Sequence, residues 1–416
     1  MKFGIITCGS RGDIQPFLAL AVALKQRGHE VKVISSENFR NFIESYDIEF
    51  IPYSTNALEL LYSEKLISCL QKKNELGVVN HLHKLGQLTI EEFTKLPHQI
   101  FNEFDFLISH VFLSAFVLSI SEKLNKKFAV VILNLPGTPT KEFPYQPVGF
   151  INHHFYNRIS YKAIKLIWLV YKKWINNHRL EIGLQRSDMW RKVFESDILT
   201  IYPMSRALIS QPNDWPSNTQ VTGFLNLPVK QTIVGYYDQV PEELDSWLSI
   251  GEKPIFIGFG SIPIPNQALI CKVVESLISA GERVVFILGW STINELAPHP
   301  NLAMVKSIDY NWLLPRCKLA IFPGGIGTID CVLKAGIPMV LLSILADQPY
   351  NSKMVADKRV AIHIPFDKLT LKKLMKAIED CQSPEFMIQV QKLSKIVNQE
   401  NGVEEAATLI EKYAKR

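Results

Sequence analysis

The amino-acid sequence predicts an α/β protein built from two doubly wound parallel-sheet domains. The chain has 416 residues, which is more than one ordinary hydrophobic core accommodates. It opens with a strand, a glycine-containing loop, a helix and a second strand, an alternation typical of parallel sheets. The same alternation begins again in the second half. Hydrophobic residues make up 47% and charged residues 20% of the chain, as in folded globular proteins.

The N-terminal elements follow from runs of apolar residues and from the glycines that interrupt them. Short apolar runs predict strands, and Gly28 ends a helix whose apolar residues recur at helical spacing. The predicted elements are a strand at Lys2–Thr7, a tight loop at Cys8–Asp13, a helix at Pro16–Arg27, and strands at Glu30–Ser35, Phe104–Ile108 and Phe128–Leu133.

The segment Ile151–Gln185 differs from its surroundings because it is rich in Tyr, Trp, Lys and Arg. Its centre, Tyr161–Ile175, is predicted to be helical, and two interpretations stay open. The helix is either a buried domain helix with solvated lysines, or an amphipathic surface element that lies at a membrane or walls an apolar pocket. The following segment Gln211–Pro228, dense in Pro, Asn, Ser and Gly, reads as the connection into a second domain.

The second half repeats the βα pattern. Short apolar runs again alternate with helical periodicity. The predicted elements are strands at Pro254–Phe259, Arg283–Leu288, Met304–Val305, Lys318–Phe322 and Met339–Leu342, and helices at Gln267–Ser279, from Thr328 to Ala335, and from about Pro349.

Composition narrows the class of function. The net charge of +5 permits anionic ligands or a membrane surface but gives no reason to propose nucleic acid. Six scattered cysteines without a CxxC pair argue against metal or disulfide use and favour a reducing cytosol. We expect no signal peptide, and the longest apolar stretch, Phe106–Ile120, is too short to span a membrane. A soluble or peripheral cytoplasmic protein is therefore expected.

A glycine-rich loop between a strand and a helix is the strongest local signal. Gly324, Gly325 and Gly327 precede Thr328, so the backbone can approach a ligand closely and direct unpaired N–H groups at it, which suits a phosphate. After the next strand, Asp347-Gln348 offers an acid and an amide that could bind hydroxyl groups. The alternatives are a tight turn for the glycines and a simple helix cap for Asp347-Gln348.

Five loops follow predicted strands and could converge. In open α/β sheets ligands bind beyond the carboxyl ends of the strands. Two such domains facing one another would bring all five loops into one cleft. The loops are Gly9–Asp13, Gly260-Ser261, Gly289-Trp290, Gly324–Thr328 and Asp347-Gln348.

The first of these loops does not fit a dinucleotide site. Gly9 and Gly12 lack the G-x-G-x-x-G spacing, so a nicotinamide oxidoreductase is a poor interpretation. Asp13 either caps the following helix or acts as a general base toward a hydroxyl. The histidines show no metal spacing and no Ser-His-Asp arrangement, so we interpret them as structural or surface residues; they include His29, His81, His83, His110, His153 and His154.

Taken together, these motifs resemble the GT-B-fold UDP-glycosyltransferases, in the branch that contains sterol 3-β-glucosyltransferases and vancomycin-aglycone-type glycosyltransferases. The segment Gly9–Pro16 is similar to that branch's G-S-R-G-D-x-x-P loop. The C-terminal half matches the family in order and spacing at Gly258–Ser261, Asn311–Leu313, Gly324–Thr328, Ala335–Pro338 and Asp347–Pro349. Residues from about 55 to 210 carry little of the resemblance.

The resemblance implies two Rossmann-like domains facing across a cleft, with a C-terminal helix that crosses back. The expected division is an acceptor-binding domain at 1–215, a linker at 216–235, a nucleotide-sugar-binding domain at 236–390 and the returning helix at 391–416. Asp13 matches the family's catalytic aspartate, and no metal is needed. The donor-binding residues implied are Ser10, Arg11, Ser261, Trp290, Tyr310, Gly324, Gly325, Gly327, Thr328, Asp347 and Gln348.

Three positions depart from the family pattern, all on the donor side. The family usually has a histidine immediately before the glycine pair, and Pro323 stands there instead. Proline has neither an N–H nor a polar side chain, so one contact to the diphosphate is missing. Tyr310 replaces the histidine of a Pro-His-Asp segment, and Asn351 replaces a tryptophan.

The sequence therefore favours an inverting glycosyltransferase that moves a hexose, glucose from UDP-glucose, to a hydroxyl of an apolar sterol, lipid or polyketide-like acceptor. No further cofactor is expected. The expected partners are the nucleotide sugar, the apolar acceptor and, as an open alternative, a membrane surface. A second hypothesis, motivated by Pro323 and Tyr310, is a binding protein for an apolar ligand that keeps the fold but has lost catalysis.

Overall fold

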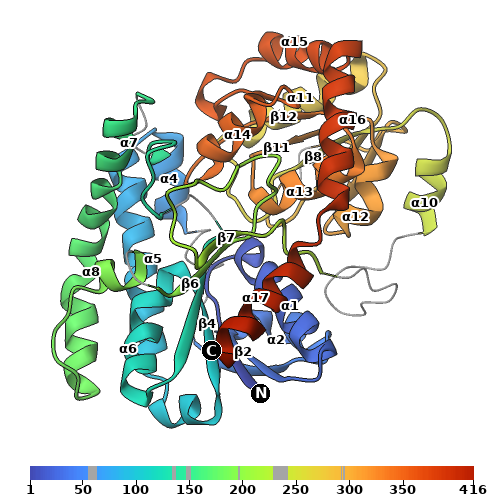
Figure 1. Ribbon diagram of the computed structural model, residues 1–416. Helices are drawn as coiled ribbons and strands as arrows, with labels where there is room; N and C mark the ends of the chain where they lie inside the picture. The colour runs from blue at the N-terminus through green and yellow to red at the C-terminus, as the bar shows by residue number, and fades with distance from the viewer. Residues whose placement is uncertain are drawn as a thin grey trace. The chain divides into compact units, whose positions relative to one another are not determined.

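The protein divides into two compact α/β units in a computed structural model (Figure 1). The structure describes residues 1–54, 63–133, 137–146, 151–194, 197–227, 242–291, 293 and 296–416. Unit 1 comprises Met1–Asn56, Gly86–Pro228 and Glu400–Arg416, and unit 2 comprises Ala57–Leu85 and Val229–Gln399.

Unit 1 is built on a seven-stranded parallel sheet with the order β3-β2-β1-β4-β5-β6-β7. Phe3 of the central strand β1 pairs with Val31 on one side and Phe106 on the other. The inner strands β1, β4 and β5 are almost entirely buried, which explains why the sequence shows them as short apolar runs, whereas the edge strand β3 is only partly buried. Their bounds are β1 Lys2–Ile6, β2 Glu30–Ser36, β3 Glu49–Tyr53, β4 Phe106–His110, β5 Lys127–Val131, β6 Leu199–Tyr202 and β7 Thr219–Val221.

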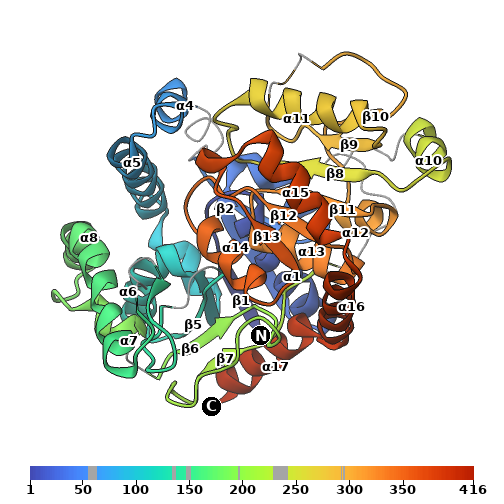
Figure 2. The same cartoon turned by 90° about the horizontal axis from the view of Figure 1, so that it is seen from above.

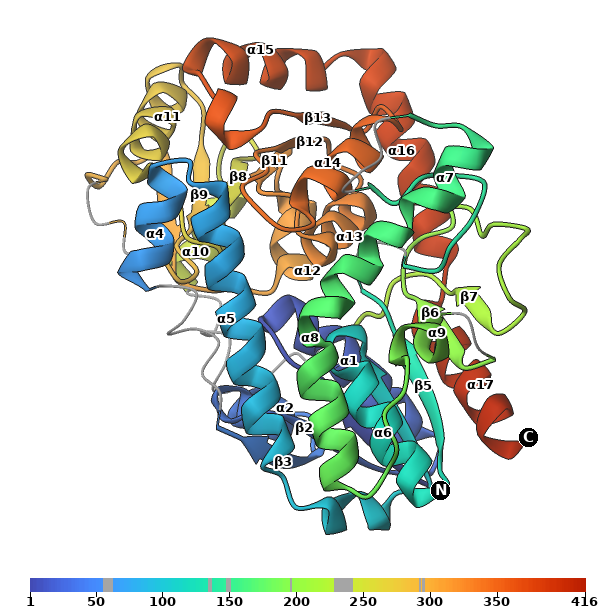
Figure 3. The same cartoon turned by 90° about the vertical axis from the view of Figure 1, so that its left-hand side faces the viewer.

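Helices of unit 1 connect and cover this sheet. The long helix α8 packs beside α6, and α7 leads into it (Figure 3). The helices are α1 Arg11–Gln26, α2 Arg40–Glu44, α6 Ser114–Leu124, α7 His154–Ser160, α8 Lys162–Glu181, α9 Met189–Phe194 and α17 Gly402–Lys415, with α5 Glu75–Thr94 shared between the units. Short 3₁₀ turns lie at Glu37–Phe39, His98–Glu103 and Val111–Leu113.

Unit 2 contains a six-stranded parallel sheet with the order β10-β9-β8-β11-β12-β13. Its core is a continuous cluster of buried apolar side chains from the sheet and from the helices Gln267–Ser279 (α11) and Leu371–Cys381 (α15). The strands are β8 Ile255–Gly258, β9 Val284–Ile287, β10 Leu302–Val305, β11 Leu319–Phe322, β12 Met339–Leu341 and β13 Ala361–His363.

Helix α16 of unit 2 packs beside α13 (Figure 2). The helices of this unit are α4 Glu64–Gln71, α10 Glu242–Ser249, α11 Gln267–Ser279, α12 Tyr310–Leu313, α13 Ile326–Ala335, α14 Gln348–Ala356, α15 Leu371–Cys381 and α16 Pro384–Gln399. Further 3₁₀ turns lie at Leu314–Arg316 and Phe366–Lys368.

The last helix of the chain belongs to unit 1, far in sequence from the elements it contacts. Helix α17 packs against α1 (Figure 1). Arg27 holds it through ion pairs of 2.6 Å to Glu404 and 2.8 Å to Glu411. His29 adds a 2.8 Å contact between its Nε2 and Glu411. The C-terminal helix therefore packs on unit 1 and does not belong to unit 2.

The predicted fold class is confirmed, because two parallel doubly wound sheets are present. Two loop boundaries were wrong. Helix α1 begins at Arg11, so Asp13 lies in its first turn and not in the preceding loop. Helix α13 begins at Ile326, two residues before the predicted start at Thr328, so Ile326 and Gly327 are already helical. In both cases polar and glycine residues, which favour loops locally, form the first helical turn because that turn needs few internal hydrogen bonds.

Candidate functional site

The first candidate cluster lies where the strand order of unit 1 reverses. Strands β1 and β4 are neighbours, but the chain runs from β1 toward β2 on one side and from β4 toward β5 on the other. Ligands bind at such switch points in doubly wound sheets. Asp13 follows β1 in the first turn of α1, and His110 is the last residue of β4.

Asp13 is held by the loop that precedes it. Its Oδ2 accepts hydrogen bonds from the Ser10 backbone N–H at 2.7 Å and from the Ser10 hydroxyl at 3.1 Å. Gly9 adopts a φ of +117°, and a Cβ built there would lie 2.4 Å from Asp13 Oδ2. Ser10 and Asp13 thus form a capping box at the start of α1, so Asp13 has the helix-cap role that the sequence suggested. The two bonds from Ser10 fix the Asp13 carboxylate in one orientation.

His110 stands opposite the second oxygen of that carboxylate. Its Nε2 lies 3.8 Å from Asp13 Oδ1, and its Nδ1 accepts from the Phe112 backbone N–H at 3.3 Å. This acceptor role assigns the ring proton to Nε2. Nε2 is buried and has no hydrogen-bond partner among the described residues.

Burial shifts the pKa values of Asp13 and His110 in opposite directions, because it disfavours the charged form of each side chain. It raises the pKa of Asp13 to about 6, while the hydrogen bonds from Ser10 oppose the shift. It lowers the pKa of His110 to about 4, so the imidazole is neutral at pH 7. The neighbouring Cys8 thiol and Tyr53 hydroxyl have pKa values raised well above their usual range, again mainly by burial. Asp13 is thus the group of this cluster that can accept a proton near neutral pH.

Arg11 is engaged within unit 1. Its Nε donates to Gln15 Oε1 at 3.1 Å, and its guanidinium lies 5.1 Å from the centre of the Phe42 ring. Ser10 contacts Asp13, as described above. Both residues were predicted to bind the donor; in this structure Ser10 bonds to Asp13, and Arg11 bonds to Gln15 within α1 and lies over the Phe42 ring.

The second candidate cluster lies at the corresponding switch point of unit 2, between β8 and β11. Gly260-Ser261 follows β8, and the glycine loop follows β11. Gly325 is the N-cap residue of α13, so the first N–H groups of that helix have no partner inside the helix. Unpaired N–H groups and the positive end of a helix dipole are the features that favour a bound anion such as phosphate.

The polar pair after β12 is tied to the glycine loop by Asn351. The Asn351 Nδ2 donates to Asp347 Oδ2 at 2.7 Å and to the Gly324 carbonyl oxygen at 3.2 Å. Gln348 is buried, and its Oε1 accepts from the backbone N–H groups of Ile344 and Leu345 at 2.9 and 3.1 Å. Gln348 therefore shapes the loop with its oxygen, and Asp347 is only partly buried.

The remaining predicted donor residues border the same sheet edge. The Trp290 backbone N–H donates to the Gly260 carbonyl at 3.1 Å, which joins the loops after β9 and β8. Tyr310 opens α12, and its ring packs edge-on at 5.1 Å against Phe256 of β8. Trp290 follows β9, as the sequence predicted, and Tyr310 follows β10 in the unit 2 sheet.

The structure gathers the predicted residues into two clusters, one in each unit. Ser10, Arg11 and Asp13 lie in unit 1, and the other predicted residues lie in unit 2. Two further residues contact these clusters but are absent from the sequence prediction of the site. His110, which the sequence interpretation places among structural or surface residues, comes two residues after the predicted strand Phe104–Ile108, and this position just beyond a strand was the available signal. Asn351 was noted only as a departure from the family pattern.

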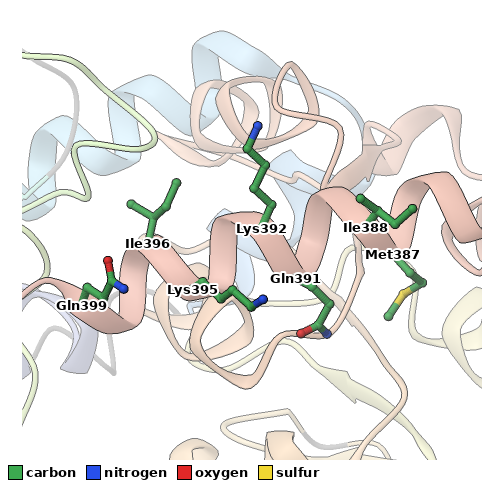
Figure 4. A pocket seen from close by; sticks show the side chains of 7 residues that line it. All are labelled: Met387, Ile388, Gln391, Lys392, Lys395, Ile396 and Gln399. Atoms are coloured by element: carbon green, nitrogen blue, oxygen red, sulfur yellow. The ribbon is translucent and has the colours of Figure 1, made fainter.

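A shallow hollow on the outer face of α16 is separate from these clusters (Figure 4). None of its lining residues belongs to the predicted donor loops. They are Met387, Ile388, Gln391, Lys392, Lys395, Ile396 and Gln399. Among the described residues no group of His, Cys, Asp and Glu side chains could hold a metal ion. No helix within the residues that the structure describes is both long and apolar enough to cross a membrane.

Comparison with known families matches both halves of the chain. Residues 3–90 match the glycosyltransferase family 28 N-terminal domain. Residues 239–404 match the family of UDP-glucuronosyl and UDP-glucosyl transferases. The matched ranges contain Asp13 and the whole glycine loop.

Among characterised relatives, a sterol 3-beta-glucosyltransferase of Arabidopsis thaliana is 28% identical over 450 residues, covering 97% of this chain and 64% of the relative. The Saccharomyces cerevisiae (strain YJM789) sterol 3-beta-glucosyltransferase is 26% identical over 438 residues, covering 98% of this chain and 35% of the relative. The chain thus spans less than two thirds of the length of each of these two relatives.

Solved structures agree in fold. The calicheamicin glycosyltransferase CalG4 has a TM-score of 0.72 at 14% identity, with 100% of this chain and 98% of CalG4 covered. The Streptomyces sp. SF2575 glycosyltransferase SsfS6, complexed with thymidine diphosphate, has a TM-score of 0.65 at 17% identity, with 99% of each chain covered. The chain therefore carries a glycosyltransferase family 28 N-terminal domain followed by a UDP-glucuronosyl and UDP-glucosyl transferase domain, and it shares the fold of GT-B glycosyltransferases.

Proposed function

We propose that the protein is an inverting hexosyltransferase that moves glucose from UDP-glucose to a hydroxyl group of a sterol or another apolar acceptor. The observation that carries the proposal is the pair of switch-point clusters, one holding a carboxylate that titrates near neutral pH and the other a helix N-terminus suited to phosphate. The sterol glucosyltransferase relatives support the choice of sugar and acceptor class.

In the proposed reaction the acceptor oxygen attacks the anomeric carbon of the donor from the side opposite the diphosphate. Asp13 takes the hydroxyl proton as the new C–O bond forms and the bond from the anomeric carbon to the phosphate oxygen breaks. A single displacement of this kind inverts the configuration of the anomeric carbon. The Ser10 hydrogen bonds keep the Asp13 carboxylate oriented during the proton transfer.

The leaving diphosphate carries the developing negative charge. In the proposal, the first N–H groups of α13 and the hydroxyls of Ser261 and Thr328 neutralise it, and Asp347 accepts hydrogen bonds from sugar hydroxyls. Pro323 contributes no N–H, so backbone groups provide more of this stabilisation than where a histidine precedes the glycines.

The proposal is tested by incubating the purified protein with UDP-glucose and cholesterol or a plant sterol and detecting the glucoside by mass spectrometry. Product with inverted configuration at the anomeric carbon is expected. TDP-glucose and GDP-glucose serve as matched donors. No glucoside with any of these donors, under conditions where calorimetry shows that the donor binds, would overturn the assignment.

Peripheral membrane contact is part of the same proposal, because a sterol acceptor resides in a bilayer. Helices α7 and α8 expose large apolar side chains, with Phe155 74%, Leu166 65% and Leu169 59% accessible. Lysines surround them, and Glu181 is the only acidic residue of the two helices; the exposed lysines are Lys162, Lys165, Lys172 and Lys173. Such a helix face fits a bilayer with anionic headgroups.

Co-sedimentation with vesicles tests this contact. The protein should bind phosphatidylcholine vesicles containing phosphatidylserine and bind weakly without the anionic lipid. Replacing Leu166 and Leu169 by Ser should reduce binding, whereas the matched variant of Ile388 and Ile396, exposed on α16, should not. Equal binding by both double variants would contradict the assignment of this face.

A second candidate function is a non-catalytic binding protein for an apolar ligand, favoured by the buried Pro323 beside the glycine loop. It predicts no transfer by the natural sequence. Under this candidate, Pro323→His restores donor affinity or turnover by a large factor. A natural sequence that turns over and a Pro323→His variant without gain would exclude it.

A further inference from the structure

A single buried amide connects the two parts of the candidate donor cluster. Asn351, in the first turns of α14, is fully buried. Its Nδ2 donates to Asp347 Oδ2 and to the Gly324 carbonyl oxygen, at 2.7 and 3.2 Å. Both partners are acceptors, so the orientation of the side-chain amide is determined by its hydrogen bonds.

The bond to Gly324 controls the direction of a neighbouring N–H group. In a trans peptide the carbonyl and the N–H point in opposite directions. Because the Gly324 carbonyl is held toward Asn351, the N–H of Gly325 points away from α14. Gly325 caps α13, so this N–H is one of the groups at the N-terminus of that helix that would face a phosphate.

The bond to Asp347 fixes the other part of the cluster. Asp347 precedes α14, and the Asn351 backbone N–H also donates to the Asp347 carbonyl at 2.9 Å. The neighbouring Ala346 adopts a φ of +58°, and the Gln348 Oε1 bonds to Ile344 and Leu345 support the same turn. The Asn351 amide therefore helps to orient the Asp347 carboxylate.

We propose that Asn351 is a positioning residue that couples the sugar-binding carboxylate of Asp347 to the phosphate-binding loop at Gly324. The inference rests on the proposed function. Its consequence is that a change at Asp347, which would contact only the sugar, also alters the affinity for a nucleoside diphosphate that has no sugar.

The burial of Asn351 supports a role in function over one in stability. Its Oδ1 is buried and has no hydrogen-bond partner among the described residues. An unsatisfied buried oxygen costs folding free energy, so an amide at this position is unfavourable for stability alone. Residues of this kind are expected at functional sites.

The test measures the binding of UDP and of UDP-glucose by calorimetry, together with the melting temperature. In Asn351→Ala, affinity for UDP-glucose should fall about tenfold and affinity for UDP about threefold. Asn351→Asp keeps the size but places an oxygen against two acceptors, so it should weaken both ligands at least as much. The KM for the donor should rise while the KM for the acceptor stays unchanged.

Ser352→Ala is the matched control. Ser352 lies in the same helical turn, is equally buried, and its hydroxyl has no partner in the described part of the chain. Its loss should leave both affinities within about twofold of the natural protein, since no hydrogen bond is removed.

A double-mutant cycle isolates the coupling. Asp347→Ala should weaken UDP binding in the natural background and have no effect on it in the Asn351→Ala background. Equal effects in both backgrounds, or Asn351→Ala affinities unchanged from the natural protein, would overturn this inference and leave the transferase proposal intact. If the natural protein binds neither UDP nor UDP-glucose, the proposed function itself fails.

Discussion

At the switch point of unit 1 two titratable side chains, Asp13 and His110, stand opposite each other, whereas at the switch point of unit 2 the groups proposed to face a ligand are mainly backbone N–H groups. Both points lie where the first strand of a sheet adjoins the strand that reverses the order, β1 beside β4 and β8 beside β11. The same topology thus supports two kinds of chemistry. A tuned pKa suits proton transfer, and fixed backbone dipoles suit an anion whose charge does not depend on the protein's protonation.

This comparison predicts that the two clusters fail in different ways when altered. Asp13→Asn removes the proton acceptor but keeps the size of the side chain and can still receive the Ser10 bonds. We expect kcat to fall by about 10²- to 10⁴-fold with UDP-glucose affinity nearly unchanged. Single-turnover kinetics and calorimetry check this, and a variant with normal kcat would remove Asp13 from the mechanism.

Gly324→Ala should damage the other cluster. Gly324 has a φ of +97°, and a Cβ there would lie 2.4 Å from the Ser352 hydroxyl. The strain of about 1–3 kcal/mol should displace the loop and weaken donor binding about tenfold or more. Gly327→Ala, whose added Cβ meets no atom within 4 Å, is the control for folding and should not lower the melting temperature. An unchanged donor affinity in Gly324→Ala would contradict the role of the loop.

The pH dependence should separate the clusters further. Because burial raises the pKa of Asp13 to about 6, kcat/KM should fall roughly tenfold per pH unit below that value. The UDP affinity of unit 2 should show no inflection from Asp13. The same raised pKa means that any contribution of Asp13 to folding stability is complete below its unfolded pKa and is lost as the pH rises through about 6. A pH–rate profile from pH 5 to 8 that is flat near 6 would exclude Asp13 as the base.

The smallest expected effect concerns His110. His110→Asn retains an acceptor for the Phe112 N–H but removes the Nε2 proton that lies 3.8 Å from Asp13. The ionised carboxylate loses a nearby donor, so the acid limb of the profile should move to higher pH and kcat/KM at pH 6 should fall about threefold. His110→Gln, which places an amide near the Nε2 position, should resemble the natural protein. Identical profiles for all three proteins would assign His110 a structural role only.

Much of the fold could be predicted because the strands and helices of an α/β protein are marked by patterns within short stretches of sequence. The helix Gln267–Ser279 was predicted with the bounds that the structure shows, and the structure adds that Asn266 caps its start. The glycine loop was also recognisable, because three glycines between an apolar run and a helix favour a close approach of the backbone to a ligand. The starts of α1 and α13 were misplaced, since Asp13 and Gly327 look like loop residues when only their neighbours in sequence are considered.

The amino-acid sequence by itself determined the alternation of strands and helices, the loops that carry polar residues and the catalytic candidate Asp13, because periodicity, glycine spacing and capping act over a few residues. Only the tertiary structure decided that His110 faces Asp13, that Asn351 joins Asp347 to Gly324, and that α17 returns to α1. These contacts join residues from different elements. Their formation depends on strand order and burial, which no local pattern encodes.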